Sequence, residues 1–265
     1  MKFRFIFWLS LLLTVWLLCS GGVNAGPLVD RLAKFPDWRG KPSVQVPRGD
    51  LVYPDWLAGT WDVTTTLVDL AAPLAPKVTS PGFESNQQFL NQPVVFQARF
   101  IENPLVNSAT GPTNLTQLMG QTFVNQPAQI VADRAFNGLN LAKTYLGDEA
   151  ILSVEVASNS PNRQLTTLRS NQQLISTVTG RATETPNADE FIATEVCQQV
   201  FNSNPRPYIN AVETTTRYHR LQTTNPAIEA DQVTAIYLSP QDPDYFKAGN
   251  RPVALYRYRL EFAPL

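Results

Sequence analysis

The chain has 265 residues, 43% of them hydrophobic, and a formal net charge of -1 at pH 7. This charge balance argues against a nucleic-acid binder, because neutralising phosphates takes clustered Lys and Arg. The length suits one large β domain, or two small ones, with enough apolar side chains for a substantial core.

The first 25 residues are typical of a secretory signal peptide. Lys2 and Arg4 precede an apolar run over 5–18, and Val23 and Ala25 form an A-x-A-like cleavage site. An uncleaved membrane anchor is the alternative, but a span needs about 20 apolar residues and this run is shorter. We therefore expect cleavage after Ala25, general secretion, and no stable membrane span in the mature chain.

The cysteine count predicts a mature chain without an internal disulfide. Of the two cysteines, Cys19 leaves with the signal peptide and only Cys197 remains. Cys197 could act as a nucleophile with His219 as its base, which would require a lowered thiol pKa. A lone strand cysteine is more typical of a small buried hydrophobe, and we expect the fold to depend on packing.

Residues 26–56 predict an irregular, proline-rich N-terminal arm, since prolines make poor helix and poor central strand. Trp38 and Trp56 indicate that the arm lies against the body of the protein. Residues 57–265 form a single β domain, in which runs rich in Thr, Val, Gln and aromatic residues alternate with turn-forming clusters. The ten expected strands cover residues 60–69, 94–102, 130–136, 150–157, 164–170, 173–180, 190–201, 209–223, 230–238 and 253–263.

One short helix interrupts the strand pattern. Asn137 can cap its N-terminus, apolar residues three or four apart share one face, and Gly147 supplies a left-handed stop. The pattern predicts a helix over 138–146, and more weakly a single turn over 115–119. Regular strands with so little helix favour an antiparallel sandwich or barrel over a parallel α/β sheet.

A three-residue motif at the first long strand resembles the Gly-x-Trp signature of lipocalins. Gly59, Thr60 and Trp61 supply it, and the last strand offers Arg257 and Arg259. In lipocalins an arginine of the last strand packs across the tryptophan ring. The resemblance implies a lipocalin/calycin-like barrel of about ten strands, closed by pairing of the first and last strands, with Trp61 buried against Arg257 or Arg259.

Over most of its mature length the chain resembles an uncharacterised cyanobacterial and plastid family, a domain of unknown function. The resemblance rests on segments such as Ser80–Asn86, Asp133–Asn137 and Val233–Leu238. It implies export to the periplasm or the thylakoid lumen. The resemblance implies no particular biochemical activity.

The candidate ligand-binding residues are Glu213, Arg217 and His219, which alternation places on one face of the strand over 209–223. If that face is interior, the three form a polar cluster able to orient a ligand. If it is exterior, they are solvated sheet residues. His219 is the only histidine, and a single imidazole without a partner motif argues against a haem site.

No catalytic motif is recognisable. The chain has no Gly-x-Ser-x-Gly elbow, no phosphate-binding glycine loop, no zinc-ligand spacing and no complete calcium loop. We therefore assign no catalytic residue, metal ligand or cofactor, and rank an enzyme third among the function classes.

Two hypotheses remain. The first is an exported non-catalytic carrier whose barrel holds a small apolar or amphipathic molecule such as a lipid, pigment or isoprenoid. The second is an assembly or scaffold factor with a filled barrel, which contacts a partner protein through its outer face, its arm or the apolar loop over 74–83. A continuous apolar cavity would favour the carrier, and a solid core the scaffold.

Overall fold

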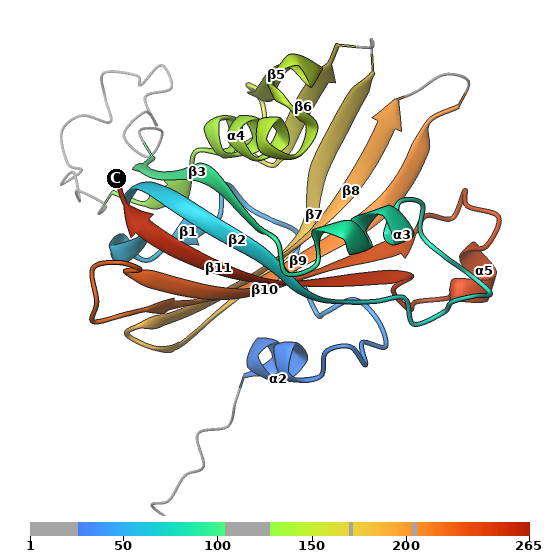
Figure 1. Cartoon of the computed structure of the whole chain (residues 1–265), viewed down its shortest axis with the longest axis horizontal. Helices are drawn as coiled ribbons and strands as arrows, with labels where there is room; N and C mark the ends of the chain where they lie inside the picture. Colours follow the sequence, from blue (N-terminus) through green and yellow to red (C-terminus); the bar gives the residue numbers. More distant parts are fainter. Residues whose placement is uncertain (1–25, 104–127, 170–171, 203–205) are drawn as a thin grey trace, which may run out of the picture.

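The computed structural model describes residues 26–103, 128–169, 172–202 and 206–265, in which eleven strands form one antiparallel sheet (Figure 1). The mainly β, antiparallel prediction is confirmed. The strands are β1 (Val52–Tyr53), β2 (Gly59–Ala71), β3 (Pro93–Glu102), β4 (Ile130–Ala132), β5 (Ile151–Val156), β6 (Arg163–Leu168), β7 (Gln173–Asn187), β8 (Glu190–Asn202), β9 (Tyr208–Arg220), β10 (Ile228–Leu238) and β11 (Ala254–Pro264).

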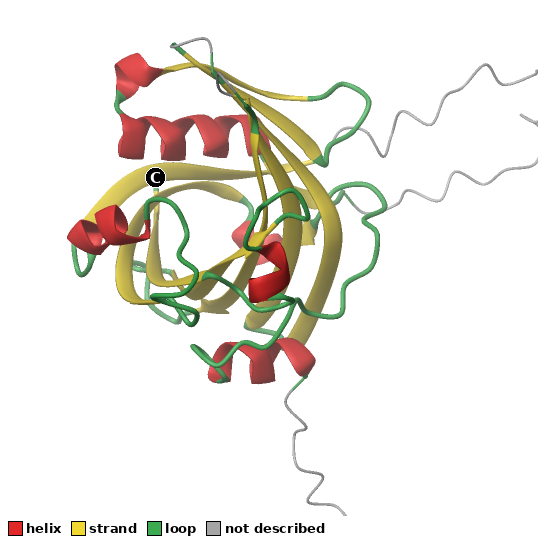
Figure 2. Cartoon of the chain, turned by 90° about the vertical axis from the view of Figure 1, so that its right-hand side faces the viewer, coloured by secondary structure: helices red, strands yellow, loops and turns green. Residues whose placement is uncertain are grey.

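The sheet curls into a half-barrel whose ladder stays open (Figure 2). Its strand order is β1-β4-β3-β2-β11-β10-β9-β8-β7-β6-β5, which leaves β1 and β5 as edges. The first long strand, β2, does pair with the last, β11, as expected. That pair lies in the middle of the sheet, so it does not close a barrel, and the closed lipocalin barrel is not confirmed.

The helices are α2 (Pro27–Ala33), α3 (Phe83–Asn86), α4 (Arg134–Leu146) and α5 (Tyr245–Ala248), with 3-10 turns at Asp55–Leu57, Gln87–Phe89 and Asp148–Ala150. The mid-chain helix, α4, ends before Gly147 (φ +87°) as predicted. It begins earlier than predicted, because Asp133 caps it by accepting the Phe136 amide at 3.1 Å. The weaker helix expected over 115–119 lies outside the described residues.

The arm is more ordered than its proline content predicts. It begins with α2, which lies under the convex side of the sheet (Figure 1). Leu28, Leu32 and Trp38 are buried there against side chains of β8, β10 and β11. Proline suits the first turn of a helix, where its missing N–H would have had no helical partner, so Pro27 starts α2 instead of preventing it.

The concave side of the half-barrel is packed with aromatic rings at one end. Tyr53 lies 4.8 Å from Phe100 and 5.7 Å from Phe191, measured between ring centroids. Trp61 and Phe262 belong to the same buried cluster. These side chains come from the arm and from strands on both halves of the sheet, so the cluster holds the curl together.

The open side of the half-barrel is bridged by the arm and by α4. Gln45 of the arm pairs with Arg181 of β7 through two backbone hydrogen bonds of 3.0 and 2.8 Å, and a few residues later β1 pairs with β4. The helix α4 packs on both β3 and β5. We call this region the seam, because it joins the two ends of the sheet without a continuous ladder.

The contact between Gly180 of β7 and Val44 of the arm provides a test of how the arm packs on the sheet. A Cβ atom at this position would overlap Cγ2 of Val44, so Gly180→Ala should push the arm off β7 at a cost of about 1–3 kcal/mol, as for overpacking elsewhere. We expect limited trypsin digestion to cleave the arm after Arg48 faster in this variant. The double variant Gly180→Ala/Val44→Ala should regain most of the protection. Equal cleavage rates in all three proteins would contradict this seating.

Candidate functional site

The predicted ligand residues share one face of β9 as expected, and that face is the convex, outer one. Glu213 is fully buried, but it lies beneath the arm instead of inside the half-barrel. The side chain of Arg217 is 39% exposed, and His219 is exposed. The face is therefore exterior and the three residues do not form a cluster inside the barrel, but only Arg217 and His219 reach solvent, whereas Glu213 is buried.

Glu213 fastens α2 to the sheet. Arg31 donates to both of its carboxylate oxygens, at 2.5 and 2.7 Å, and the Tyr237 hydroxyl donates to it at 2.8 Å. The guanidinium of Arg31 also lies 3.9 Å from the ring centroid of Trp38. Burial, and then the Glu213 charge, raise the pKa of Tyr237, so that hydroxyl stays a donor. This set of contacts satisfies itself and has a structural role.

Four of the predicted residues line one shallow groove of about 530 Å³ on the convex side. They are Arg217, His219, Arg257 and Arg259. The acids Glu190, Glu229 and Asp231 line the same groove. Arg217 pairs with Glu190 at 2.5 Å and Arg257 with Asp231 at 2.7 Å. The pairing neutralises most of the charge in the groove, so it offers little to attract a charged ligand.

The expected packing of an arginine on Trp61 is wrong. Trp61 is buried on the concave side, donates its indole N–H to the Leu57 carbonyl at 2.9 Å, and meets Phe262 edge to face. The register of β2 and β11 sets Trp61 opposite Pro264 and Asp69 opposite Arg257. Arg257 therefore lies toward the other end of the strand pair from Trp61 and Arg259 near its middle. Both arginines face the convex side, opposite to Trp61, which the three-residue motif could not indicate.

Cys197 and His219 cannot work as a nucleophile and its base. Cys197 shares the concave-facing side of β8 with Glu195, whereas His219 faces outward from β9. Burial, followed by the Glu195 charge, raises the pKa of Cys197 to about 12. The thiol is therefore protonated at neutral pH, which removes its nucleophilic form.

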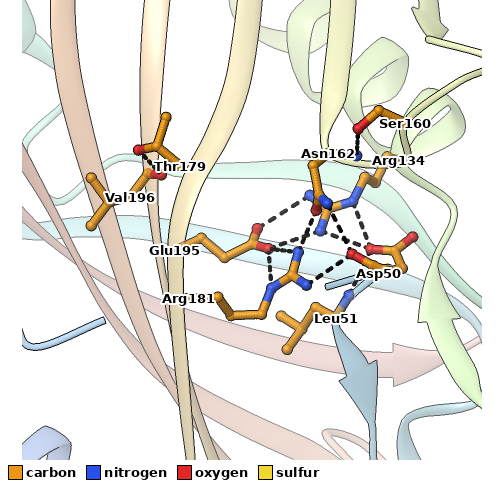
Figure 3. A network of polar contacts seen from close by, with 10 residues as sticks. Asp50, Leu51, Arg134, Ser160, Asn162, Thr179, Arg181, Glu195 and Val196 are labelled. Atoms are coloured by element: carbon orange, nitrogen blue, oxygen red, sulfur yellow. Dashed lines mark hydrogen bonds and ion pairs between the residues drawn. The ribbon is translucent and has the colours of Figure 1, made fainter. Parts of the chain in front are cut away.

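A charged network occupies the seam (Figure 3). Glu195 of β8 accepts hydrogen bonds from Arg134 of α4 at 2.9 Å and from Arg181 of β7 at 2.6 Å. Arg134 donates a further bond to Asp50 of the arm at 3.0 Å, and Arg181 donates to Asn162, in the turn between β5 and β6, at 2.7 Å. One carboxylate of β8 thus joins α4 and β7 directly, and through their arginines the arm and the turn between β5 and β6.

The network controls the ionisation of Glu195. Burial alone would raise its pKa, but the charges and hydrogen bonds of Arg134, and then of Arg181, outweigh it and hold the pKa below the usual value. A carboxyl whose pKa is lower in the folded chain contributes stability above its unfolded pKa. That contribution is lost as the pH falls through the folded-state value.

Replacing Glu195 by Gln should lower the free energy of unfolding by about 3 kcal/mol at pH 7, because Arg134 and Arg181 would lose their buried counter-charge. The variant should also lose less stability than the parent between pH 7 and pH 4. Urea unfolding at both pH values measures this. Glu261→Gln, which removes an exposed partner of Arg259, is the control and should cost under about 1 kcal/mol. Equal losses in the two variants would contradict the role of the seam.

The remaining candidate site is a cleft of about 870 Å³ between the arm and β7. We call it the arm cleft; it is lined by Pro27, Leu28, Arg31, Lys34, Asp37, Trp38, Arg39, Gly40, Lys41, Pro42, Ser43, Ala182, Thr183 and Glu184. A second cleft of about 740 Å³ shares Ser43, Ala182 and Thr183 with it and continues along the arm past Arg48. Together they follow the arm from α2 to the seam.

The arm cleft is rich in unpaired cations. Lys34, Arg39 and Lys41 are exposed, and none has an ion pair with the part of the chain that the structure describes. Of the two acids, Glu184 is engaged, because it accepts the Leu28 and Val29 amides of α2 at 2.7 and 3.3 Å. The cleft is therefore a local positive region on a chain that is close to neutral.

This site was missed from the sequence, although a signal for it was present. Five cations fall within residues 31–48, against the single acid Asp37. The prolines of this segment predict an irregular arm, and its excess of cations is a separate signal that points to the cleft. Within the described ranges there is also no group of three or more His, Cys, Asp or Glu placed to hold a metal ion, and no helix long and apolar enough to cross a membrane.

Comparison with known proteins gives one match. A family model described as "Domain of unknown function (DUF6816)" covers residues 45–265, which include the end of the arm and the whole sheet. No curated protein and no solved structure matches the chain.

Proposed function

Since the chain belongs to this family, whose description assigns no activity, we propose a function from the geometry: an exported, non-catalytic assembly factor that holds an anionic segment of a partner protein in the arm cleft. The observation that carries this proposal is the set of unpaired cations, Lys34, Arg39 and Lys41, beside a cleft on the outside of a packed half-barrel.

The packing of the concave side favours an assembly factor over a carrier. Aromatic rings fill one end of the half-barrel, around Tyr53 and Phe191, and the network of Glu195 occupies the seam. A lipid, pigment or isoprenoid would need an apolar wall that encloses most of its surface. Side chains take that position at this end and at the seam, whereas the arm cleft lies on the outside.

The shape and charge of the arm cleft favour a peptide segment. The cleft and its continuation run from α2 past Arg48, which suits an elongated occupant. Lys34, Arg39 and Lys41 supply charge at its rim, and buried Trp38 gives it a rigid floor because the contact with Arg31 holds the ring. Complementary charge increases the rate and the specificity of such an encounter.

The place where this factor would act follows from the N-terminal segment. Residues 1–25 lie outside the described part of the structure, and their pattern supports export to the periplasm or the thylakoid lumen. Cleavage after Ala25 would leave the arm as the start of the mature chain. The cations of the arm cleft would then lie near the new N-terminus.

The proposal is tested with exported protein whose intact mass places its first residue at Gly26, and a fluorescent hexaglutamate peptide as probe. The triple variant Lys34→Ala/Arg39→Ala/Lys41→Ala should weaken binding about tenfold in low salt, since each exposed cation contributes up to about 1 kcal/mol. Fluorescence anisotropy measures the Kd.

The matched control removes three exposed cations that line neither the arm cleft nor its continuation: Lys77→Ala/Arg169→Ala/Arg220→Ala. It lowers the net charge equally, so it should change the Kd less than twofold if binding is local. Equal weakening by both triple variants, or no binding of the probe, would overturn the proposal. A lipid or pigment retained by the purified protein and unaffected by the triple variant would favour the carrier.

A further inference from the structure

The outer edge of β7 is only partly covered. The strand β6 pairs with β7 over Gln173–Thr177, and the arm pairs with it at Arg181. Beyond Arg181 the structure has no further bridge between β7 and the arm, within the residues it describes. The next arm residues toward the N-terminus are Val44, Ser43 and Pro42. Antiparallel register places Ser43 opposite Thr183, but no backbone hydrogen bond joins these two residues, and Pro42 has no N–H to extend a ladder.

The ladder geometry shows which backbone groups are left free. In an antiparallel pair, successive residues direct their N–H and C=O groups alternately to one side and the other. Arg181 directs both groups to Gln45, away from β8. Thr183 is two residues further along and directs its groups the same way, and no described backbone group bonds to them.

Thr183 also lies at the junction of the two clefts. It lines both, its side chain is exposed, and its neighbour Ala182 is too small to block an approaching chain. Lys41 is on the opposite wall of the arm cleft. A strand edge and a row of cations therefore face the same space.

We propose that the occupant of the arm cleft is an extended, acidic peptide that adds as a strand to β7 at Thr183. This inference rests on the proposed function and adds the mode of binding. The main-chain groups of Thr183 would pair with the peptide backbone, and alternate acidic side chains would reach Lys34, Arg39 and Lys41. Strand addition takes its affinity from the backbone and its selectivity from side chains on one face.

The test uses a six-residue peptide of alternating Glu and Val, in three forms: unmodified, N-methylated on the Glu amides, and N-methylated on the Val amides. An added strand directs only one of these two sets of amides to β7. One methylated peptide should therefore bind about tenfold more weakly than the other. Both carry the same charge and the same number of methyl groups, so each is the control for the other.

A pair of protein variants tests the same contact from the other side. Thr183→Pro removes the outward N–H and leaves the ladder to β8 intact, because that N–H does not point to β8. It should weaken binding of the unmodified peptide several-fold, whereas Thr183→Val, which keeps the N–H, should not. If Thr183→Pro does not fold, the methylated peptides still decide the question.

The outcomes separate the two proposals. No binding of the unmodified peptide, or binding unaffected by the triple variant at Lys34, Arg39 and Lys41, contradicts the proposed function together with this inference. Binding that depends on those cations but is equal for the two methylated peptides contradicts strand addition alone. Binding that depends on the cations and differs between the methylated peptides supports both.

Discussion

The structure depends on one carboxylate held between two arginines. Glu195 is the point at which α4, β7 and, through Arg134, the arm are joined. The sheet itself cannot close, because β1 and β5 are edge strands at opposite ends of its order. The curl is therefore maintained by side chains across the seam and by the aromatic cluster on the concave side. In a closed barrel, a continuous ladder of backbone hydrogen bonds would hold the sheet instead.

The seam has a consequence for the outer surface. The arm reaches it only after it has crossed the convex side, where Arg31 and Glu213 anchor α2. Because the arm is fixed at both ends, the stretch between α2 and Gln45 is held beside β7 with a cleft under it. The cations of that stretch are thus held on a frame that is fixed at both ends, which would lower the conformational entropy lost on binding of the proposed peptide.

Ten of the eleven strands in the described residues overlap predicted ones, because alternation and turn residues are local signals, and Gly147 located the C-terminal end of α4. The prediction missed β1 and extended the strand over 130–136 into residues that begin α4. It could not tell which face of β9 is buried. Glu213 is buried only because Arg31, 182 residues away along the chain, supplies its counter-charge. It also could not distinguish Asp133 from Asn137 as the cap of α4, since both residues suit that position and the contact of Asn137 with Arg99 depends on the tertiary fold.

Native-state hydrogen exchange at the Arg181 amide tests the seam most directly, because Gln45 accepts that amide and no strand covers it there. If the arm closes the seam as a fixed element, this amide should exchange about as slowly as the ladder amides of β8 and β9 and be released only with global unfolding. An Arg181 amide that exchanges at the rate of an open strand edge, while β8 and β9 remain protected, would contradict the account.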